Sequence, residues 1–317
     1  MTDTQNEVFK SPVNKIRLFE HGAPGSQNLK LTRKYYTEDM PDGRVKHIVQ
    51  NITDPDIVPY IPDGIGNSTD RQRIPAVLII PGGAFRRLVY NFEGEDVAKW
   101  LNSMGIAAFV LECRLPSDEH DNAEDVPLID AIRAMRVIRG RAQEFGIDEA
   151  KIGVMGFSAG GFMAALLSTA YESDVYADYK YKDEYDKLSA RPDLAVCSYP
   201  VISIDDCIEA GKRYMSEEQV LERISDSKAK ILHKYNPDKL VRPDMPPVFI
   251  CETDDDRTTL SENSVGFYMA ARKAGVSAEL HIFRTGGHGY GCGDDFAQTG
   301  EWKVLFTKWI KSIGIIS

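Results

Sequence analysis

The sequence predicts one α/β domain in which a mostly parallel central sheet is covered by helices on both faces. Near-continuous apolar runs, such as 76–80 and 107–111, alternate with longer segments of helical periodicity. Strands that are apolar throughout are typical of a parallel sheet buried on both faces. The length of 317 residues and the hydrophobic content of 43% suit one large domain of this class, or one domain with an insertion.

The beginning of the chain lies outside this alternation. Residues 1–28 show no clear periodicity, so they are predicted to form an irregular N-terminal segment, and the α/β domain is expected to span 29–317. Two strands are predicted at 30–36 and 45–49, because the turn sequence Pro41-Asp42-Gly43 stands between them.

Strands and helices alternate from Ala76 onward. The later strands are predicted at 107–111, 151–155, 194–199, 247–251 and 278–283. Helices are predicted at 95–104, which is amphipathic, and at 127–145, which begins with a proline in a favoured position. Two polar segments, 171–190 and 204–242, interrupt the alternation. Each is expected either to form part of a small lid over a site or to be a solvated excursion.

The most informative stretch is Gly156-Phe157-Ser158-Ala159-Gly160. An apolar run precedes it, and a segment rich in small and apolar residues, typical of a helix, follows it. Between a strand and a helix, a G-x-S-x-G motif predicts a sharp turn that lifts the serine hydroxyl out of the carboxyl edge of the sheet. Glycines are expected where side chains would collide with the neighbouring strand and helix. Ser158 is therefore the candidate nucleophile.

A serine nucleophile needs a base to accept its proton and an acid to orient that base. On sheets of this kind the order along the chain is serine, acid, histidine. The strand at 247–251 leads into Glu252-Thr253-Asp254-Asp255-Asp256, which places several acids at the carboxyl edge. The strand at 278–283 leads into Gly286-Gly287-His288-Gly289. A histidine between glycines on a loop is unobstructed, so His288 is the predicted base.

Attack on an ester carbonyl produces an oxyanion, which needs fixed backbone N–H donors. The residue after the nucleophile, Ala159, is expected to supply one of them. The strand at 76–80 ends in Pro81-Gly82-Gly83-Ala84, whose small residues let the backbone approach an oxygen closely. Gly83 and Ala84 are the other expected donors.

Composition argues against several classes of partner. The formal net charge is −10, so we expect no nucleic-acid partner and no charge-driven membrane binding. No apolar run approaches the length of a membrane span, and no pair of histidines has the spacing of a metal site. Neither a metal nor an organic cofactor is expected. Five cysteines without a C-x-x-C, and a start without a signal-like pattern, predict free thiols in the cytoplasm.

These elements together resemble the α/β-hydrolase superfamily and, within it, bacterial esterases of the acetyl xylan esterase and acetylhydrolase type. The likeness runs from about residue 16 to the end of the chain. Besides the serine motif, it is carried by Leu18–Gly25, Arg114-Leu115-Pro116, Asp130-Ala131 and Tyr199–Ser203. The chain departs from the family where the opening motif lacks its tryptophan, where Pro81 replaces a histidine, and where Ala84 replaces a third glycine.

The resemblance implies the α/β-hydrolase fold and a Ser-His-Asp triad. Relatives place the acid seven residues before an Asn-Ser pair, and here Asn263-Ser264 puts it at Asp256. Asp255 remains the alternative, because Arg257–Leu260 does not match the residues that follow the acid in the family. The implied activity is that of a serine carboxylesterase, expected to be an O-deacetylase of small acylated compounds such as acetylated xylo-oligosaccharides.

Two other interpretations stay open. A serine peptidase acting on small peptides could use the acids at 172–186 to hold the peptide amine. A hydrolase fold used only for binding is disfavoured, because both the serine and the histidine are present. The expected partner is a small ester with a short acyl group, since neither polar segment carries a long apolar stripe. Polar, flat side chains in the first segment would suit sugars, namely Tyr171, Tyr176, Tyr179, Tyr181 and Tyr185.

Overall fold

The apolar runs of the sequence form one eight-stranded sheet in the order β1-β4-β7-β5-β8-β9-β10-β11. The structure is a computed structural model that describes residues 9–64, 73–225, 227–293 and 298–317. The strands are β1 (Ile16–Arg17), β4 (Asp56–Tyr60), β5 (Ile74–Ile80), β7 (Ala107–Glu112), β8 (Ile147–Phe157), β9 (Ala195–Ser198), β10 (Val248–Thr253) and β11 (Ala278–Phe283). From β7 to β11 all neighbours are parallel, whereas β4 and β1 pair antiparallel at one edge. The predicted fold class is confirmed.

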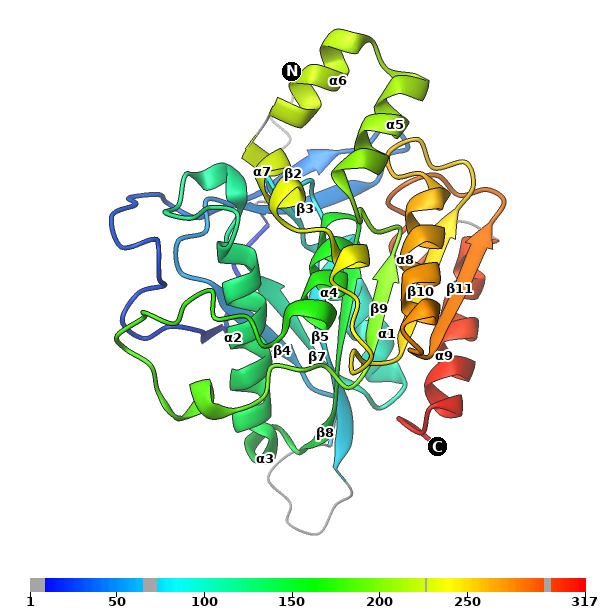
Figure 1. Ribbon diagram of the computed structural model, residues 1–317. Coiled ribbons are helices and arrows are strands. Elements are labelled where there is room, and N and C mark those ends of the chain that lie inside the picture. Colours follow the sequence, from blue (N-terminus) through cyan, green and yellow to red (C-terminus); the bar gives the residue numbers. More distant parts are fainter. Residues whose placement is uncertain (1–8, 65–72, 226, 294–297) are drawn as a thin grey trace, which may run out of the picture.

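Helices cover both faces of this sheet (Figure 1). On one face lie α2 (Val126–Gly140), α4 (Ala159–Ala170) and α8 (Ser261–Lys273), and on the other lie α1 (Asp96–Ser103) and α9 (Trp302–Ser312). The last two helices contact each other through Trp100 and Trp302, whose ring centroids are 4.9 Å apart. The helix predicted at 127–145 is α2 followed by the short α3 (Ala142–Phe145). Because β5 and β7 to β10 are buried almost throughout, the core lies on both sides of the sheet.

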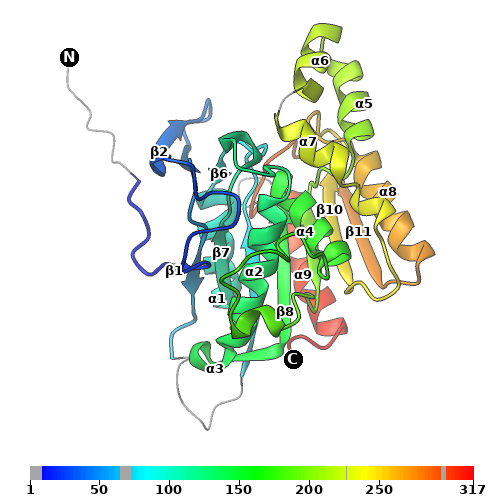
Figure 2. The same ribbon diagram turned by 60° about the vertical axis from the view of Figure 1, so that its left-hand side comes forward.

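A second, smaller sheet lies toward the carboxyl ends of the parallel strands (Figure 2). It contains β2 (Lys34–Asp39), β3 (Val45–Gln50) and β6 (Leu88–Val89), all antiparallel. The first two strands flank the predicted turn at 41–43, which is closed by a hydrogen bond from the N–H of Gly43 to the carbonyl of Met40. This sheet contributes to the candidate site described below.

The N-terminal segment is part of the core rather than a separate unit. Leu18 and Phe19 are buried, although the described residues before 29 contain only the short β1. The fully buried guanidinium of Arg114, after β7, donates to Asp130 of α2 at 2.6 Å and to Ser26 at 2.8 Å. The buried guanidinium thus joins the start of the chain to the sheet and to α2, and the division between 1–28 and 29–317 stays a prediction.

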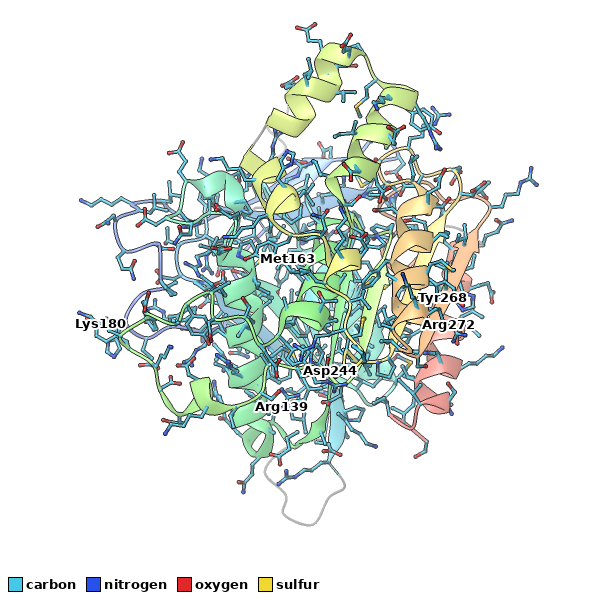
Figure 3. All side chains as sticks on the ribbon, viewed as in Figure 1. Arg139, Met163, Lys180, Asp244, Tyr268 and Arg272 are labelled. Atoms are coloured by element: carbon cyan, nitrogen blue, oxygen red, sulfur yellow. The ribbon has the colours of Figure 1, made fainter. Side chains whose placement is uncertain are left out.

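The two polar segments lie at opposite edges of the main sheet. Residues 204–242 contain α5 (Ile204–Tyr214), α6 (Glu217–Ser225) and α7 (Ser227–Lys234), which lie beyond the carboxyl ends of the strands in both views. Residues 171–190 lie toward the opposite edge, where a short 3-10 helix (Glu184–Lys187) packs against α2. Lys180 marks the outer edge of this segment (Figure 3). The segment follows α4, which runs back from the carboxyl edge, and this direction explains its position.

Candidate active site

Ser158 occupies the sharp turn between β8 and α4 that the sequence predicts. Its φ of 54° and ψ of −118° are strained for a residue other than glycine. A Cβ on Gly156 would lie 1.9 Å from the carbonyl oxygen of Gly160, and a Cβ on Gly160 would lie 1.9 Å from that of Ile80. Only glycine fits at either position, so the spacing of the motif follows from the close approach of strand, turn and helix.

The three side chains expected to act together are brought together. Ser158 Oγ lies 2.8 Å from Nε2 of His288, and Nδ1 of the same ring lies 2.6 Å from Oδ2 of Asp256. The two loops that carry His288 and Asp256 follow the neighbouring parallel strands β11 and β10, whose ends are in register. The order of the strands therefore sets this line of hydrogen bonds.

Asp256 is held as an ionised acceptor. Its side chain is buried, and burial raises its pKa. Hydrogen bonds outweigh that effect, so the pKa of Asp256 lies below its ordinary value. They come from the ring of His288, from the backbone N–H groups of Thr258 and Thr259 at 2.6 and 3.0 Å, and from the Thr259 hydroxyl at 2.9 Å.

Asp255, the alternative acid, has a different position. Its Oδ1 accepts the backbone N–H groups of Gly286 and Gly287 at 3.0 and 2.8 Å. These glycines precede His288 in the loop after β11. Asp255 thus fixes the conformation of the histidine loop, while only Asp256 contacts the imidazole.

The three expected oxyanion donors lie beside Ser158. Ala159 is the first residue of α4, and Gly83 and Ala84 have φ angles of 137° and 58° in the loop after β5. Within the described part of the chain, the N–H groups of these three residues have no acceptor. The N–H of Gly82 is instead occupied, because it donates to Glu93 Oε2 at 2.8 Å.

Glu93 and Tyr199 belong to this site, although the sequence did not single them out for it. Tyr199 donates its hydroxyl to Glu93 Oε1 at 3.0 Å and accepts the N–H of Gly291 at 3.0 Å. Its ring lies edge-on to that of His288, with centroids 5.1 Å apart. Burial raises the pKa of Glu93, against the opposing effects of the charge on His288 and of hydrogen bonds from Tyr199 and Gly82. The pair braces the oxyanion loop against the histidine loop.

A cavity of about 250 Å³ opens over these groups. Ser158, His288, Gly83 and Ala84 line it, and so do Met40, Arg44 and Lys46 from the smaller sheet and its turn. No described residue of 171–190 borders it, so the geometry favours the solvated excursion over the lid for this segment. The tyrosines of that segment bond elsewhere, as Tyr179 does to the carbonyl of Gly22. The lid role of 204–242 stays a prediction.

The described residues also bear on two other classes of function. No group of three or more histidine, cysteine, aspartate or glutamate side chains is arranged to hold a metal ion. None of the described helices is both long and apolar enough to cross a membrane. All five cysteines are buried, and none of them is part of a disulfide bond.

Residues 65–270 match the family model described as BD-FAE. An acetylxylan esterase of Xylanibacter ruminicola is 30% identical over 240 residues, which are 75% of this chain and 45% of that protein. Endo-1,4-beta-xylanase B of Butyrivibrio fibrisolvens is 31% identical over 228 residues, 71% of this chain and 34% of that protein. This chain therefore spans less than half the length of these curated relatives.

Solved structures give full-length matches. An acetyl ester-xyloside bifunctional hydrolase from Caldicellulosiruptor lactoaceticus is 35% identical, with a TM-score of 0.69 over 96% of this chain and 97% of that chain. An esterase from Thermogutta terrifontis, solved with propionate, is 23% identical, with a TM-score of 0.64 over 93% of this chain and 96% of that chain. The second match supports the fold alone.

Proposed function

Because this chain belongs to the BD-FAE family and has the α/β-hydrolase fold of known esterases, we propose that it is a serine carboxyl ester hydrolase. Ser158, His288 and Asp256 are its catalytic triad. The observation that carries this proposal is the continuous line of hydrogen bonds from Ser158 Oγ through the imidazole to the buried carboxylate.

The proposed reaction has two halves. Ser158 Oγ attacks the acyl carbon while His288 Nε2 accepts its proton, and the ionised Asp256 stabilises the resulting imidazolium. The N–H groups of Ala159, Gly83 and Ala84 stabilise the oxyanion. The intermediate collapses to an acyl-enzyme, and the departing alcohol takes the proton from His288. Water then gives a proton to the same nitrogen and attacks the acyl carbon. This second intermediate collapses, the acid leaves, and His288 returns the proton to Ser158 Oγ, which restores the enzyme.

The proposed substrates are small acetyl esters, with acetylated xylo-oligosaccharides as the first to test. The names of two relatives, an acetylxylan esterase and an acetyl ester-xyloside hydrolase, support this class. So does the cavity of about 250 Å³, which is below the usual range for drug-sized ligands. The peptidase alternative is disfavoured, because the rim charges of Arg44, Lys46 and Arg87 would repel a peptide amine.

Labelling and turnover test the mechanism together. The parent should hydrolyse 4-nitrophenyl acetate and incorporate one fluorophosphonate on Ser158, as located by mass spectrometry. Ser158→Ala should lose at least about 10³-fold in kcat/KM, in line with other triads. Ser168→Ala is the matched control, because Ser168 lies in the same helix and bonds only to the carbonyl of Ala164. Ester turnover by Ser158→Ala within tenfold of the parent would refute the assignment.

A further inference from the structure

One wall of the cavity over Ser158 is cationic. Arg44, Lys46 and Arg87 line it, and all three come from the smaller sheet or the segments next to it. Among the described residues that line the cavity, the only carboxylate is that of Glu93, which is buried. This concentration of positive charge stands in a chain whose formal net charge is −10. It therefore calls for a local explanation.

Two of the three cations have partners on the protein. Arg87 forms an ion pair with Glu38 at 2.5 Å. Arg44 pairs with Asp42 at 2.8 Å, and its guanidinium lies 5.2 Å from the centroid of the Phe92 ring. These contacts hold both guanidinium groups at the rim and partly offset their charges.

Lys46 is different. It stands directly opposite Glu38 in the pairing of β3 with β2, but Glu38 is engaged by Arg87. In the part of the chain that the structure describes, Lys46 forms no ion pair. Its positive charge acts on Glu93. Burial raises the pKa of Glu93, and Lys46 is one of the smaller influences that lower it. Lys46 is half-buried, and a cation in that setting gains most from an anion that arrives with the ligand.

We propose that Lys46, flanked by Arg44 and Arg87, binds a carboxylate carried by the substrate, so that the enzyme prefers acetylated sugar acids to neutral acetylated sugars. An acetyl group carries no charge, so the carboxylate belongs to the alcohol part of the ester. The inference rests on the proposed function, in which this cavity receives the ester. It adds a substrate class and assigns a specificity role to a side chain outside the triad and the oxyanion hole.

A matched pair of esters isolates the charge. The anionic probe is 4-acetoxybenzoate, and the neutral probe of nearly the same shape is 4-acetoxybenzamide. Lys46→Gln should lower the anionic-to-neutral ratio of kcat/KM about fivefold or more, mainly through KM for the anion, as expected for the loss of one partly exposed ion pair. Lys46→Arg should retain most of the ratio. Lys308→Gln, an exposed site on α9, removes the same charge away from the cavity and should leave the ratio unchanged.

Each result decides between explanations. Raising the salt concentration should reduce the ratio in the parent but not in Lys46→Gln, because screening acts on an exposed charge pair. An equal loss on both probes would overturn the proposal, since Lys46 would then act through Glu93 instead of through the ligand. A Lys46-dependent preference for 4-nitrophenyl hemisuccinate over its methyl ester, without one in the acetoxy pair, would place the anion on the acyl side and also overturn it.

The controls distinguish a failure of this inference from a failure of the proposed esterase function. Turnover of 4-acetoxybenzamide by the parent tests the esterase itself, whereas the ratio between the probes tests the role of Lys46. If the parent hydrolyses the neutral ester but the ratio does not depend on Lys46, only the inference fails. If it hydrolyses neither acetate, both fail. Thermal unfolding of Lys46→Gln shows whether the variant is folded, and the Lys46→Arg result stands on its own.

Discussion

Replacing Asp256 by asparagine should remove most ester turnover, because the amide has one favourable orientation. Oδ1 of Asp256 accepts the backbone N–H groups of Thr258 and Thr259, so the amide oxygen must take that place. The NH2 group then faces Nδ1 of His288, at the position where Oδ2 lies 2.6 Å away. A donor there requires Nδ1 to be unprotonated, which puts the proton on Nε2 and prevents the ring from accepting one from Ser158.

The contacts of Asp256 set the size of this effect. In the opposite orientation the amide would present its NH2 group to the N–H groups of Thr258 and Thr259 and leave both without that acceptor, and the Thr259 group is buried. Orphaning one buried donor costs about 1–3 kcal/mol, so the loss at Thr259 alone disfavours the productive orientation by about 5-fold to 150-fold, and the partly buried Thr258 adds to this. We expect kcat/KM for 4-nitrophenyl acetate to fall by more than about tenfold. Asp255→Asn is the matched control, because its amide oxygen can still accept from Gly286 and Gly287, and it should stay within about fivefold of the parent.

The comparison can fail in two ways. If Asp255→Asn is the more damaging substitution, the acid of the triad is placed one residue too late. If Asp256→Asn retains activity within tenfold of the parent, the tautomer argument is wrong whichever carboxylate is used. Rates should be measured from pH 5 to 9, because a change of tautomer lowers activity across this whole range instead of shifting the profile.

The same substitution changes the stability of the protein in acid. Since the pKa of Asp256 is lower in the folded protein than its ordinary 3.8, its ionisation stabilises the fold fully above that value. The contribution is lost as the pH falls through the folded pKa. Asp256→Asn should therefore show a shallower fall of Tm below about pH 5 than the parent. Equal slopes would contradict the lowered pKa.

The remaining predictions concern folding, mechanism and substrate. Gly160→Ala should greatly lower Tm, because its Cβ would lie 1.9 Å from the carbonyl oxygen of Ile80; Gly266→Ala in α8, with no atom within 4 Å, should be neutral or gain up to about 1 kcal/mol. Asp130→Asn should lower the free energy of unfolding in urea by about 3–5 kcal/mol, because it leaves the buried guanidinium of Arg114 without its counter-charge, and a loss below 1 kcal/mol would argue against that. Ester turnover should survive EDTA, and activity that returned only with added zinc would overturn the serine mechanism. Across a series of 4-nitrophenyl esters, kcat/KM should peak at acetyl or propionyl, and a peak at eight carbons or longer would exclude a short-acyl enzyme.

Local sterics made part of the site predictable from the sequence. A Cβ on Gly156 or Gly160 would lie 1.9 Å from a carbonyl oxygen, so the two glycines of the motif alone indicate the sharp turn at Ser158. His288 and the acids before it follow strands in register, and strand order along the chain was enough to bring them together. The choice of Asp256 over Asp255 needed the resemblance, because neighbouring carboxylates on one loop differ only in direction.

Other parts depended on contacts between distant segments. Glu93 lies in a π-helical turn at Asn91–Glu95 and resembles an ordinary surface acid in sequence, yet it is buried against Gly82 and Tyr199. Its position between Phe92 and Gly94 was the only signal for it in the sequence. The position of 171–190 could have been deduced, because a segment that follows a helix in such a sheet returns to the amino edge. The prediction placed 171–190 on the site side because it did not follow the direction of α4, which precedes this segment.

The contacts of Tyr199 limit how this protein can be altered. One phenol connects Glu93 and Gly291, which are 106 and 92 residues from it along the chain, so the two loops beside the serine share a single anchor. A laboratory library that randomises either loop alone would disturb the other and return mostly inactive clones. Varying both loops together while Tyr199 is kept, or grafting them as one block from a relative, leaves that anchor intact. In natural lineages the same constraint would make substitutions in the two loops appear in pairs.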